Sequence, residues 1–329
     1  MSDLRLVAEI GVNHDGDMQR AVAMTHATAE AGFDAVKFQY WNADELLAPA
    51  APNAGYQGPG DQHALLASLR LDIAALAAVE HVAHGLGLDF IVTPDGERAC
   101  HELLELRLDA IKIGSGDADN VSLLDVAVSS GLPIIASTGM MTEAEVIALA
   151  ERLADARDVT LLHCVSAYPT RLDENGLNRM ARLAQLSGRP VGLSDHSLGI
   201  AVTAAAVAMG AVTVEKHVTW SVEARGPDHA MSLPLDAAAE WVRTLRELKA
   251  GLGAVSCSRE EAANRAVVRK GLYLRRAVAA DAVIEAADIL PLRPLLDGIP
   301  AGDLRAAAGH SAARDLKAGQ LLRWSDLHR

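Results

Sequence analysis

Eight short apolar segments, each followed by a stretch of helix length, recur along most of this 329-residue chain. Apolar runs of this length, bounded by turns, are typical of buried parallel strands. The count and the strict alternation predict an α/β fold, a (β/α)8 TIM barrel, which typically needs about 250 residues. A doubly wound open sheet is the alternative, but it seldom needs eight such units. The predicted strands are residues 6–10, 34–39, 90–94, 110–116, 133–139, 160–166, 191–196 and 212–217.

Capping residues support the helices between these segments. Asp17 precedes one helix and Gly32 ends it, while Thr142 and Glu145 form a capping box at the start of another. Residues 41–62 are too many for a simple connection and predict a lid or a pocket wall. The predicted helices are residues 18–31, 72–85, 98–106, 121–130, 142–156, 175–186, 200–209 and 237–252.

The pattern changes after residue 254. We expect a barrel domain over residues 1–254, a polar linker over 255–269, and a small, mostly β domain over 270–329. The last domain contains a weak internal repeat and is barely large enough to support its own core. It would therefore gain stability from docking on another surface.

Charge and cysteine content exclude several classes of protein. The net charge of −13 argues against nucleic acid and anionic membranes as partners, so an anionic substrate needs local cations. Three cysteines without metal-type spacing are typical of a reducing compartment. Because no signal peptide or membrane-spanning stretch is evident, we expect a soluble cytoplasmic protein.

The last two predicted strands both end in a histidine, His196 and His217, beside the carboxylates Asp195 and Glu215. A lone histidine at a strand end is more often a structural hydrogen-bonding group. Two on adjacent strands are a candidate site for a divalent metal ion that polarises a carbonyl.

Polar groups also end the other strands, at the barrel face where TIM-barrel chemistry lies. Lys37 and Lys112 end apolar strands, which is costly unless an anion meets them, although a barrel carboxylate would explain one of them. With Thr93 and the turns after Lys112 and at Ser137, they favour a phosphorylated and carboxylated substrate. Glu9 is a candidate for positioning or deprotonating water; its alternative role is to hold a lysine.

The whole chain resembles the sialic acid synthase family, which includes the legionaminate and pseudaminate synthases. The tail from about residue 270 resembles the family's antifreeze-like (SAF) domain, with Arg293-Pro294 in place. The stretches that carry the resemblance are Ala8–Gly16, Val36–Gln39, Lys112–Asp117, Ser137–Met140, Leu162–Cys164, Tyr168–Thr170, Gly192–His196, Glu215–His217 and Gly226–His229.

The resemblance implies a transferase that condenses phosphoenolpyruvate with an N-acylated amino-sugar aldehyde, such as N-acetylmannosamine, and releases phosphate. It also implies a divalent metal, usually Mn²⁺ with Mg²⁺ or Co²⁺ as alternatives, on His196 and His217. The implied catalytic residues are Glu9, Lys37 and Lys112. The implied phosphoenolpyruvate-binding residues are Lys37, Thr93, Lys112, Ser115, Ser137, Ser166 and Ser194, and the implied sugar-binding residues are Gln39, Asp117, Tyr168, Asp228 and Arg293.

The family resemblance further implies a domain-swapped homodimer in which Arg293 reaches the partner's barrel. Three positions depart from the family pattern: Ser166 replaces an asparagine, Asp95-Gly96-Glu97 follows Thr93-Pro94, and Asp281 replaces a turn glycine. A related synthase acting on another aldose is therefore the alternative, including one for a pseudaminic or legionaminic precursor, a neutral hexose or a specialised-metabolite sugar. Deoxy-octulosonate or deoxy-heptulosonate synthases, a non-catalytic sugar-binding protein and a metal hydrolase are further alternatives.

Overall fold

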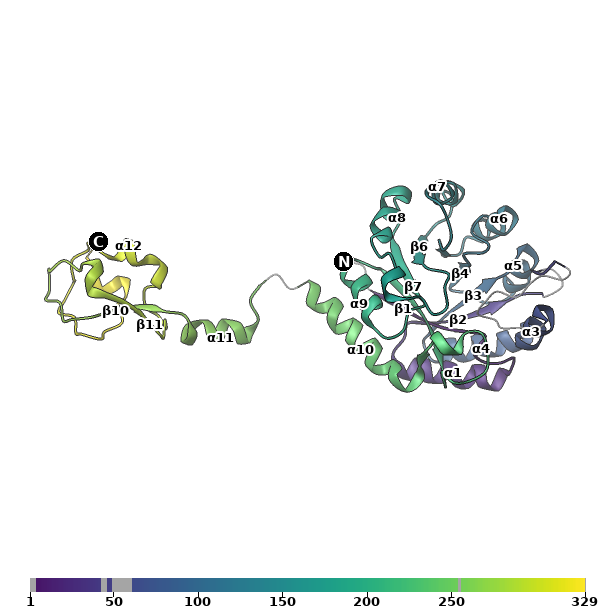
Figure 1. Ribbon diagram of the computed structural model, residues 1–329, viewed down its shortest axis with the longest axis horizontal. Coiled ribbons are helices and arrows are strands. Elements are labelled where there is room, and N and C mark those ends of the chain that lie inside the picture. The colour runs from purple at the N-terminus through teal and green to yellow at the C-terminus, as the bar shows by residue number, and fades with distance from the viewer. Residues whose placement is uncertain (1–3, 43–45, 49–60, 254–255, 329) are drawn as a thin grey trace. The chain divides into compact units, whose positions relative to one another are not determined.

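The computed structural model describes residues 4–42, 46–48, 61–253 and 256–328 (Figure 1). Most of the predicted lid or pocket wall lies outside these residues. The chain divides into two compact units, Met1–Gly253 and Ala254–Arg329. Within the described part of the chain, none of the helices combines the length and apolar content needed to cross a membrane.

The first unit is a closed barrel of eight parallel strands. Strand β1 pairs with both β2 and β8, so the sheet has no free edge, and Figure 1 shows the helices arranged around it. The prediction of a TIM barrel is confirmed. The strands are β1 (Arg5–Gly11), β2 (Ala35–Tyr40), β3 (Asp89–Pro94), β4 (Ala110–Ile113), β5 (Ile134–Ser137), β6 (Val159–Cys164), β7 (Val191–Asp195) and β8 (Thr213–Thr219), with the short β9 (Leu233–Pro234) paired to the end of β8.

The eight predicted helices begin and end close to their predicted positions, and one further helix of this unit, α3 (Gln62–Leu69), was not predicted. Asp17 caps α1 by accepting hydrogen bonds from the backbone of Gln19 and Arg20, and the capping box at Thr142 is formed in both directions. The helices of this unit are α1 (Met18–Ala31), α3 (Gln62–Leu69), α4 (Ile73–Gly85), α5 (Glu97–Leu103), α6 (Val121–Ser129), α7 (Glu143–Arg152), α8 (Arg179–Ser187), α9 (Ala201–Ala208) and α10 (Leu235–Leu252).

Strands β1 to β6 each contribute to two apolar layers, because successive side chains of a strand point to opposite faces. The outward-facing side chains pack against the helices in the main core. The inward-facing side chains form a second buried cluster, made of Val7, Ala35, Ile91, Ala110, Ile135 and Leu162. In every one of these strands the next inward-facing residue toward the C-terminal end is polar or a cysteine. The inner cluster is thus an apolar floor beneath a polar layer.

The predicted linker over residues 255–269 contains a helix. This is α11 (Arg259–Val268), whose N-cap Ser258 accepts a hydrogen bond from the backbone of Glu261. Polar, alanine-rich composition suits a solvent-exposed helix as well as a linker, and no side chain of α11 is buried. The hairpin of β10 (Gly271–Leu274) and β11 (Ile289–Leu292) and the short α12 (Leu304–Ala307) surround a separate small core.

The internal repeat of the tail has a structural counterpart. Arg276 pairs with Asp288 and Arg314 with Asp326, each at 2.6 Å, at equivalent places in the two copies. The turn of the first copy has Asp281 with φ of 64°, where the second has a glycine with φ of 76°. Aspartate tolerates this left-handed conformation better than most residues, so the turn is retained without glycine.

One glycine in β7 is required by close packing between strands. A Cβ at Gly192 would lie 2.2 Å from the carbonyl oxygen of Thr213 and 2.7 Å from Leu162 Cδ2. We expect Gly192→Ala to lower the free energy of unfolding by about 2 kcal/mol or more, because the strand backbone must shift. The matched control is Gly85→Ala, where no atom lies within 4 Å and the change should be neutral or stabilising by up to about 1 kcal/mol. Urea denaturation of both variants measures the difference; equal effects would contradict the packing argument.

Candidate active site

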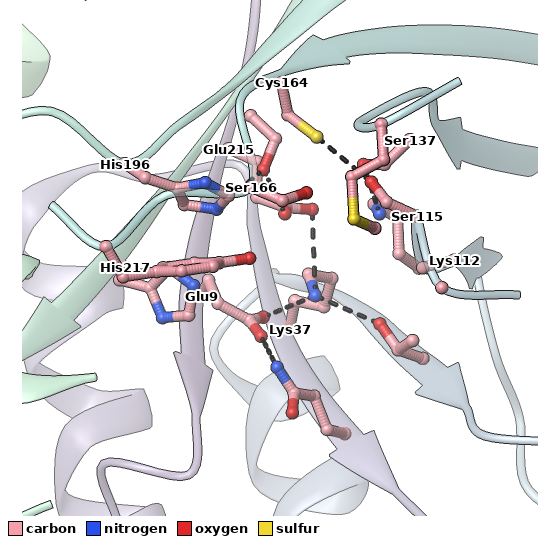
Figure 2. A pocket seen from close by; sticks show the side chains of 17 residues that line it. Glu9, Lys37, Lys112, Ser115, Ser137, Cys164, Ser166, His196, Glu215 and His217 are labelled. Carbon is pink, nitrogen blue, oxygen red and sulfur yellow. Dashed lines mark hydrogen bonds and ion pairs between the residues drawn. The ribbon is translucent and has the colours of Figure 1, made fainter. Parts of the chain in front are cut away.

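A cavity of about 530 Å³ opens at the C-terminal ends of the strands, above the apolar floor (Figure 2). In Figure 2 the two histidines lie on one side, Lys112 and Ser137 on the other, and Glu9 and Lys37 between them. The lining residues are Glu9, Lys37, Gln39, Thr93, Lys112, Gly114, Ser115, Gly116, Ser137, Met140, Cys164, Ser166, Tyr168, Ser194, His196, Glu215 and His217.

Strand register brings the charged groups together. Glu9 of β1 is paired with Lys37 on one side and with His217 on the other, while Ser194 is paired with Glu215. Because these are neighbouring positions on parallel strands, all five side chains face the same end of the barrel interior. Residues of the first and last strands thus become direct neighbours.

Lys37 is a buried lysine held by carboxylates. Its ammonium lies 2.8 Å from Glu9 Oε2 and 3.8 Å from Glu215 Oε2, and it donates a hydrogen bond to Thr93 Oγ1 at 3.0 Å. Gln39 Nε2 donates to the other oxygen of Glu9 at 2.8 Å. The alternative explanation of a lysine paired with a barrel carboxylate therefore applies to Lys37, and Glu9 is its closest partner.

Lys112, unlike Lys37, has no carboxylate partner: within the described part of the chain no carboxylate lies within ion-pair distance of its ammonium. Lys112 Nζ donates to Ser137 Oγ at 2.7 Å and to the carbonyl of Ile113 at 3.0 Å, and the residue is 3% exposed. Burial lowers the pKa of Lys112, with partial compensation from the charge of Glu215. A buried cation without a carboxylate contact, facing a cavity, is suited to bind an anion.

The carboxylates respond to the same burial in opposite ways. For Glu9, burial raises the pKa and the ion pair with Lys37 only partly opposes it. For Glu215, burial also favours the neutral form, but Lys37 and Lys112 outweigh it and lower the pKa. Burial alone lowers the pKa of Lys37, yet Glu215 and Glu9 outweigh it and raise the pKa. The site therefore contains a firmly ionised Glu215 and a more basic Glu9.

Small hydroxyl residues converge on one glycine beside Lys112. Ser115 Oγ accepts a hydrogen bond from the backbone N–H of Gly139 at 3.0 Å and lies 3.1 Å from Cys164 Sγ. A Cβ at Gly139 would lie 2.5 Å from Ser166 Oγ, 2.7 Å from Cys164 Sγ and 2.8 Å from Ser115 Oγ. Glycine at this turn thus lets three polar side chains meet at the end of the cavity that holds Lys112.

The two histidines lie close together, and burial favours the neutral form of both. Their ring centroids are 5.6 Å apart, and burial lowers the pKa of both. His196 Nδ1 lies 2.8 Å from the carbonyl of Val165, which can only accept, so in the neutral ring Nδ1 carries the proton and Nε2 is the unprotonated nitrogen, 3.5 Å from Ser194 Oγ. His217 Nδ1 is a buried atom without a hydrogen bond in the described structure, 3.5 Å from Asp228 Oδ2.

Neutral imidazoles of this kind suit a divalent transition metal. Among the described residues no group of three or more histidine, cysteine, aspartate or glutamate side chains has metal-binding geometry. A metal ion held by His196 and His217 would accordingly take its remaining ligands from water or substrate oxygens.

A second, smaller cavity of about 130 Å³ adjoins the histidine side. It shares Gln39, Tyr168 and His217 with the first cavity and adds Asp228, so three of the proposed sugar-binding residues lie together. Burial raises the pKa of Asp228 to about 7. Asp117 lines neither cavity and accepts a hydrogen bond from Asn120 at the start of α6. Arg293 belongs to the second unit, so its role stays a prediction.

Sequence reasoning left five cavity residues out of the proposed site: Gly114, Gly116, Met140, Cys164 and Glu215. Glu215 was detectable, because it lies two residues before His217 and strand alternation directs both to the same face. Cys164 follows from the same rule, as the residue two positions after the floor residue Leu162. Met140 lies in a loop with a positive φ of 64°, where no periodicity guides a prediction.

Comparison with known proteins places these features in a family. The model of the NeuB family matches residues 24–256, and that of the SAF domain matches residues 269–328. An N,N'-diacetyllegionaminic acid synthase from Legionella pneumophila is 35% identical and covers 98% of this chain and 94% of its own length. A pseudaminic acid synthase from Campylobacter jejuni is 26% identical and covers 98% and 96%.

A solved structure shows a similar architecture. The N-acetylneuraminic acid (sialic acid) synthetase of Leptospira borgpetersenii, in complex with citrate, has a TM-score of 0.71 at 27% identity. It covers 80% of this chain, which covers 90% of that structure.

The environment of Lys112 generates a test of anion binding. Folding lowers the pKa of this lysine, so below its folded pKa the buried ammonium destabilises the protein. We therefore expect Lys112→Met to raise the melting temperature without ligand. It should also weaken inorganic phosphate binding by about tenfold or more, the loss expected for a charged hydrogen bond. Calorimetry with phosphate measures both effects, with the exposed Lys317→Met as control; undiminished phosphate binding would contradict the assignment.

Proposed function

The chain belongs to the NeuB family, and from this membership we propose that it condenses phosphoenolpyruvate with an N-acyl amino-sugar aldehyde to give a sialic-type nonulosonic acid and phosphate. The chain is an enzyme, a transferase that forms a carbon–carbon bond, and its substrates are phosphoenolpyruvate and a sugar. The SAF domain follows the catalytic barrel.

The single observation that supports the proposed substrate orientation is the environment of the buried Lys112 ammonium. This ammonium has no carboxylate contact among the described residues, and the hydroxyls of Ser115 and Ser137 lie beside it. These groups suit the phosphate or carboxylate of phosphoenolpyruvate. Lys37 lies across the cavity, with its charge shared between Glu9 and Glu215. An incoming anion would also be attracted by the ammonium of Lys37 and would therefore be held between the two lysines.

The proposed reaction forms one carbon–carbon bond and one carbon–oxygen bond to water, and it breaks the carbon–oxygen bond to phosphate. C3 of phosphoenolpyruvate bonds to the aldehyde carbon of the open-chain sugar, and the aldehyde oxygen takes up a proton. Positive charge develops at C2, where the oxygen of a water molecule adds and gives up one proton. The tetrahedral carbon then expels phosphate, its hydroxyl becomes the ketone carbonyl and passes its proton to the leaving phosphate, and Lys112 and Lys37 stabilise the phosphate charge.

Glu9 is the residue best placed to receive the proton of that water. It lines the cavity between Lys37 and His217, and burial raises its pKa, which makes it a stronger base than a free glutamate. Its hydrogen bond from Gln39 fixes one carboxylate oxygen and leaves the oxygen near Lys37 without any other partner in the described structure.

A divalent metal ion, most suitably Mn²⁺, would be held by His196 and His217 and would supply Lewis-acid polarisation of the aldehyde oxygen. The support for this proposal is the unprotonated Nε2 of His196, whose contact with Ser194 Oγ is long at 3.5 Å, and the buried Nδ1 of His217, which has no hydrogen bond among the described residues. Tyr168, whose ring centroid is 4.3 Å from that of His196, would position the sugar beside the pair.

The sugar is the open part of the proposal. The relative from Legionella is named for a diacetylated sugar and that from Campylobacter for pseudaminic acid, at lower identity. The run from Gly226 to His229 favours the sialic or legionaminic type. Its glycine is closely packed, because a Cβ at Gly226 would lie 2.7 Å from His229 Cδ2. A synthase acting on another aldose remains the alternative. The cytoplasmic location stays a prediction.

The first experiment follows phosphate release. With Mn²⁺, phosphoenolpyruvate and a panel of aldehydes, we expect phosphate and a nine-carbon acid only when an N-acyl amino sugar is present. The panel contains N-acetylmannosamine, its diacetylated dideoxy relatives and neutral hexoses, and mass spectrometry identifies the product. Glu9→Gln should lower kcat by about 10²-fold or more, because a general base is removed. His217→Ala should abolish metal-dependent turnover.

Two outcomes would contradict this assignment. Phosphate release with aldose phosphates but with no amino sugar would favour a deoxy-octulosonate or deoxy-heptulosonate synthase. Sugar binding without turnover, unchanged in His217→Ala, would favour a non-catalytic protein.

We also propose that the active unit is a domain-swapped dimer in which Arg293 acts on the partner's site. The second unit has only a small core, so it would gain stability by docking on another surface. Its Arg293, which follows β11 directly, is exposed and could reach a partner. Mixing His217→Ala with Arg293→Ala chains, after joint refolding, tests it. If tail and barrel act across subunits, heterodimers contain one intact site, so about a quarter of wild-type activity should return. No recovery from two inactive variants would mean that each chain completes its own site.

A further inference from the structure

A buried ion pair lies on the outer side of the two histidine-bearing strands. Lys216 Nζ of β8 is 2.8 Å from Asp195 Oδ2 of β7, and the two side chains are 1% and 0% exposed. An ion pair taken wholly out of water often contributes little net stability, because desolvation offsets the attraction. Its position therefore requires an explanation other than stability.

The strand register gives that explanation. Asp195 and Lys216 are register partners on neighbouring strands, and each immediately precedes one of the two histidines. Since side chains alternate, Ser194 and Glu215 face the cavity while Asp195 and Lys216 face away from it. The ion pair thus links β7 and β8 on their outer faces. Each of its two residues directly precedes a histidine whose side chain faces the cavity.

The same pair also holds the backbone on the far side of His196. Asp195 Oδ1 accepts hydrogen bonds from the backbone and hydroxyl of Ser197, at 2.8 and 2.7 Å. Lys216 Nζ donates to the carbonyl of Ser197. Both residues that flank His196 are consequently tied to β8. Thr203 Oγ1 of α9 donates to Asp195 Oδ2 at 2.7 Å, and this hydrogen bond joins Asp195 to a helix rather than to β8.

We propose that Asp195 and Lys216 are positioning residues that set the distance and orientation between the imidazoles of His196 and His217. This inference rests on the proposed function in one respect, namely that the two imidazoles bind a divalent ion. Neither residue lines the cavity. Their effect is to fix two ligands that belong to different strands and that no direct bond joins.

The test measures Mn²⁺ affinity separately from folding and from anion binding. Full-length metal-free protein is titrated with Mn²⁺ by electron paramagnetic resonance, and inorganic phosphate binding is measured calorimetrically without metal. Lys216→Met should weaken Mn²⁺ binding by about tenfold or more, the range typical for residues that orient metal ligands, and change phosphate binding less than about twofold. Thr203→Val, which removes one hydrogen bond from the same carboxylate, should leave Mn²⁺ affinity within about twofold.

The double variant Asp195→Asn/Lys216→Met separates positioning from stability. Lys216→Met alone leaves a buried carboxylate without its cation and should unfold at lower denaturant concentration, whereas the double variant removes that uncompensated charge and should recover stability. We expect its Mn²⁺ affinity to stay reduced, because the bond between the strands is still missing. If Lys216→Met does not fold, the double variant provides the measurement.

The outcomes that overturn the inference are distinct from those that overturn the function. A folded double variant with wild-type Mn²⁺ affinity, or an equal loss of phosphate binding, would exclude a positioning role. So would an equal loss in Thr203→Val. If wild type binds Mn²⁺ no better than His217→Ala, the proposed metal pair fails and this inference fails with it. If the wild-type enzyme is active and binds Mn²⁺ through the two histidines, but the Lys216→Met and double variants keep wild-type Mn²⁺ affinity, the inference alone is wrong.

Discussion

Four charged side chains buried at one end of the barrel set the conditions for the rest of the site. Two ammonium groups, Lys37 and Lys112, share a small volume with two carboxylates, Glu9 and Glu215. Buried charges are tolerated when each is compensated, and here the compensation is uneven. Lys37 has two carboxylate partners, while Lys112 has hydrogen-bond acceptors but no carboxylate at ion-pair distance in the described structure. The uneven distribution makes Lys112 the group best suited to bind the anion that we propose.

Strand alternation and register place these charged groups at one end of the barrel. The period of two along each strand produces an apolar floor, a polar wall two residues further on, and an outer face that packs against helices. Closure of the barrel between β1 and β8 places Glu9 next to His217, so the candidate base adjoins the candidate metal ligand. The ion pair of Asp195 and Lys216 lies behind the same strands and links them where the histidines begin.

Most of the fold and much of the site were predictable from local patterns. The eight strands, the caps at Asp17 and Thr142, and the polar strand ends all follow from short-range chemistry. The helix α11 within the predicted linker was not anticipated, because its polar and alanine-rich sequence suits either an irregular linker or an exposed helix. The predicted site was incomplete where position depends on a loop, as for Met140. Asp117 lines neither cavity and lies in the loop before α6, so its role toward the sugar stays a prediction.

The sequence by itself determined the number of barrel units, the face of each strand and the kinds of chemical group available at the strand ends. These properties depend on periodicity and side-chain chemistry, which are local. Only the tertiary structure decided which groups are partners: that Glu9 and Glu215 hold Lys37, that Lys112 has no carboxylate at ion-pair distance among the described residues, and that Lys216 pairs with Asp195 behind the histidines. The physical reason is that pairing between buried charges depends on distances of a few ångströms between strands. Register and barrel closure set these distances, and neither can be read from one segment alone.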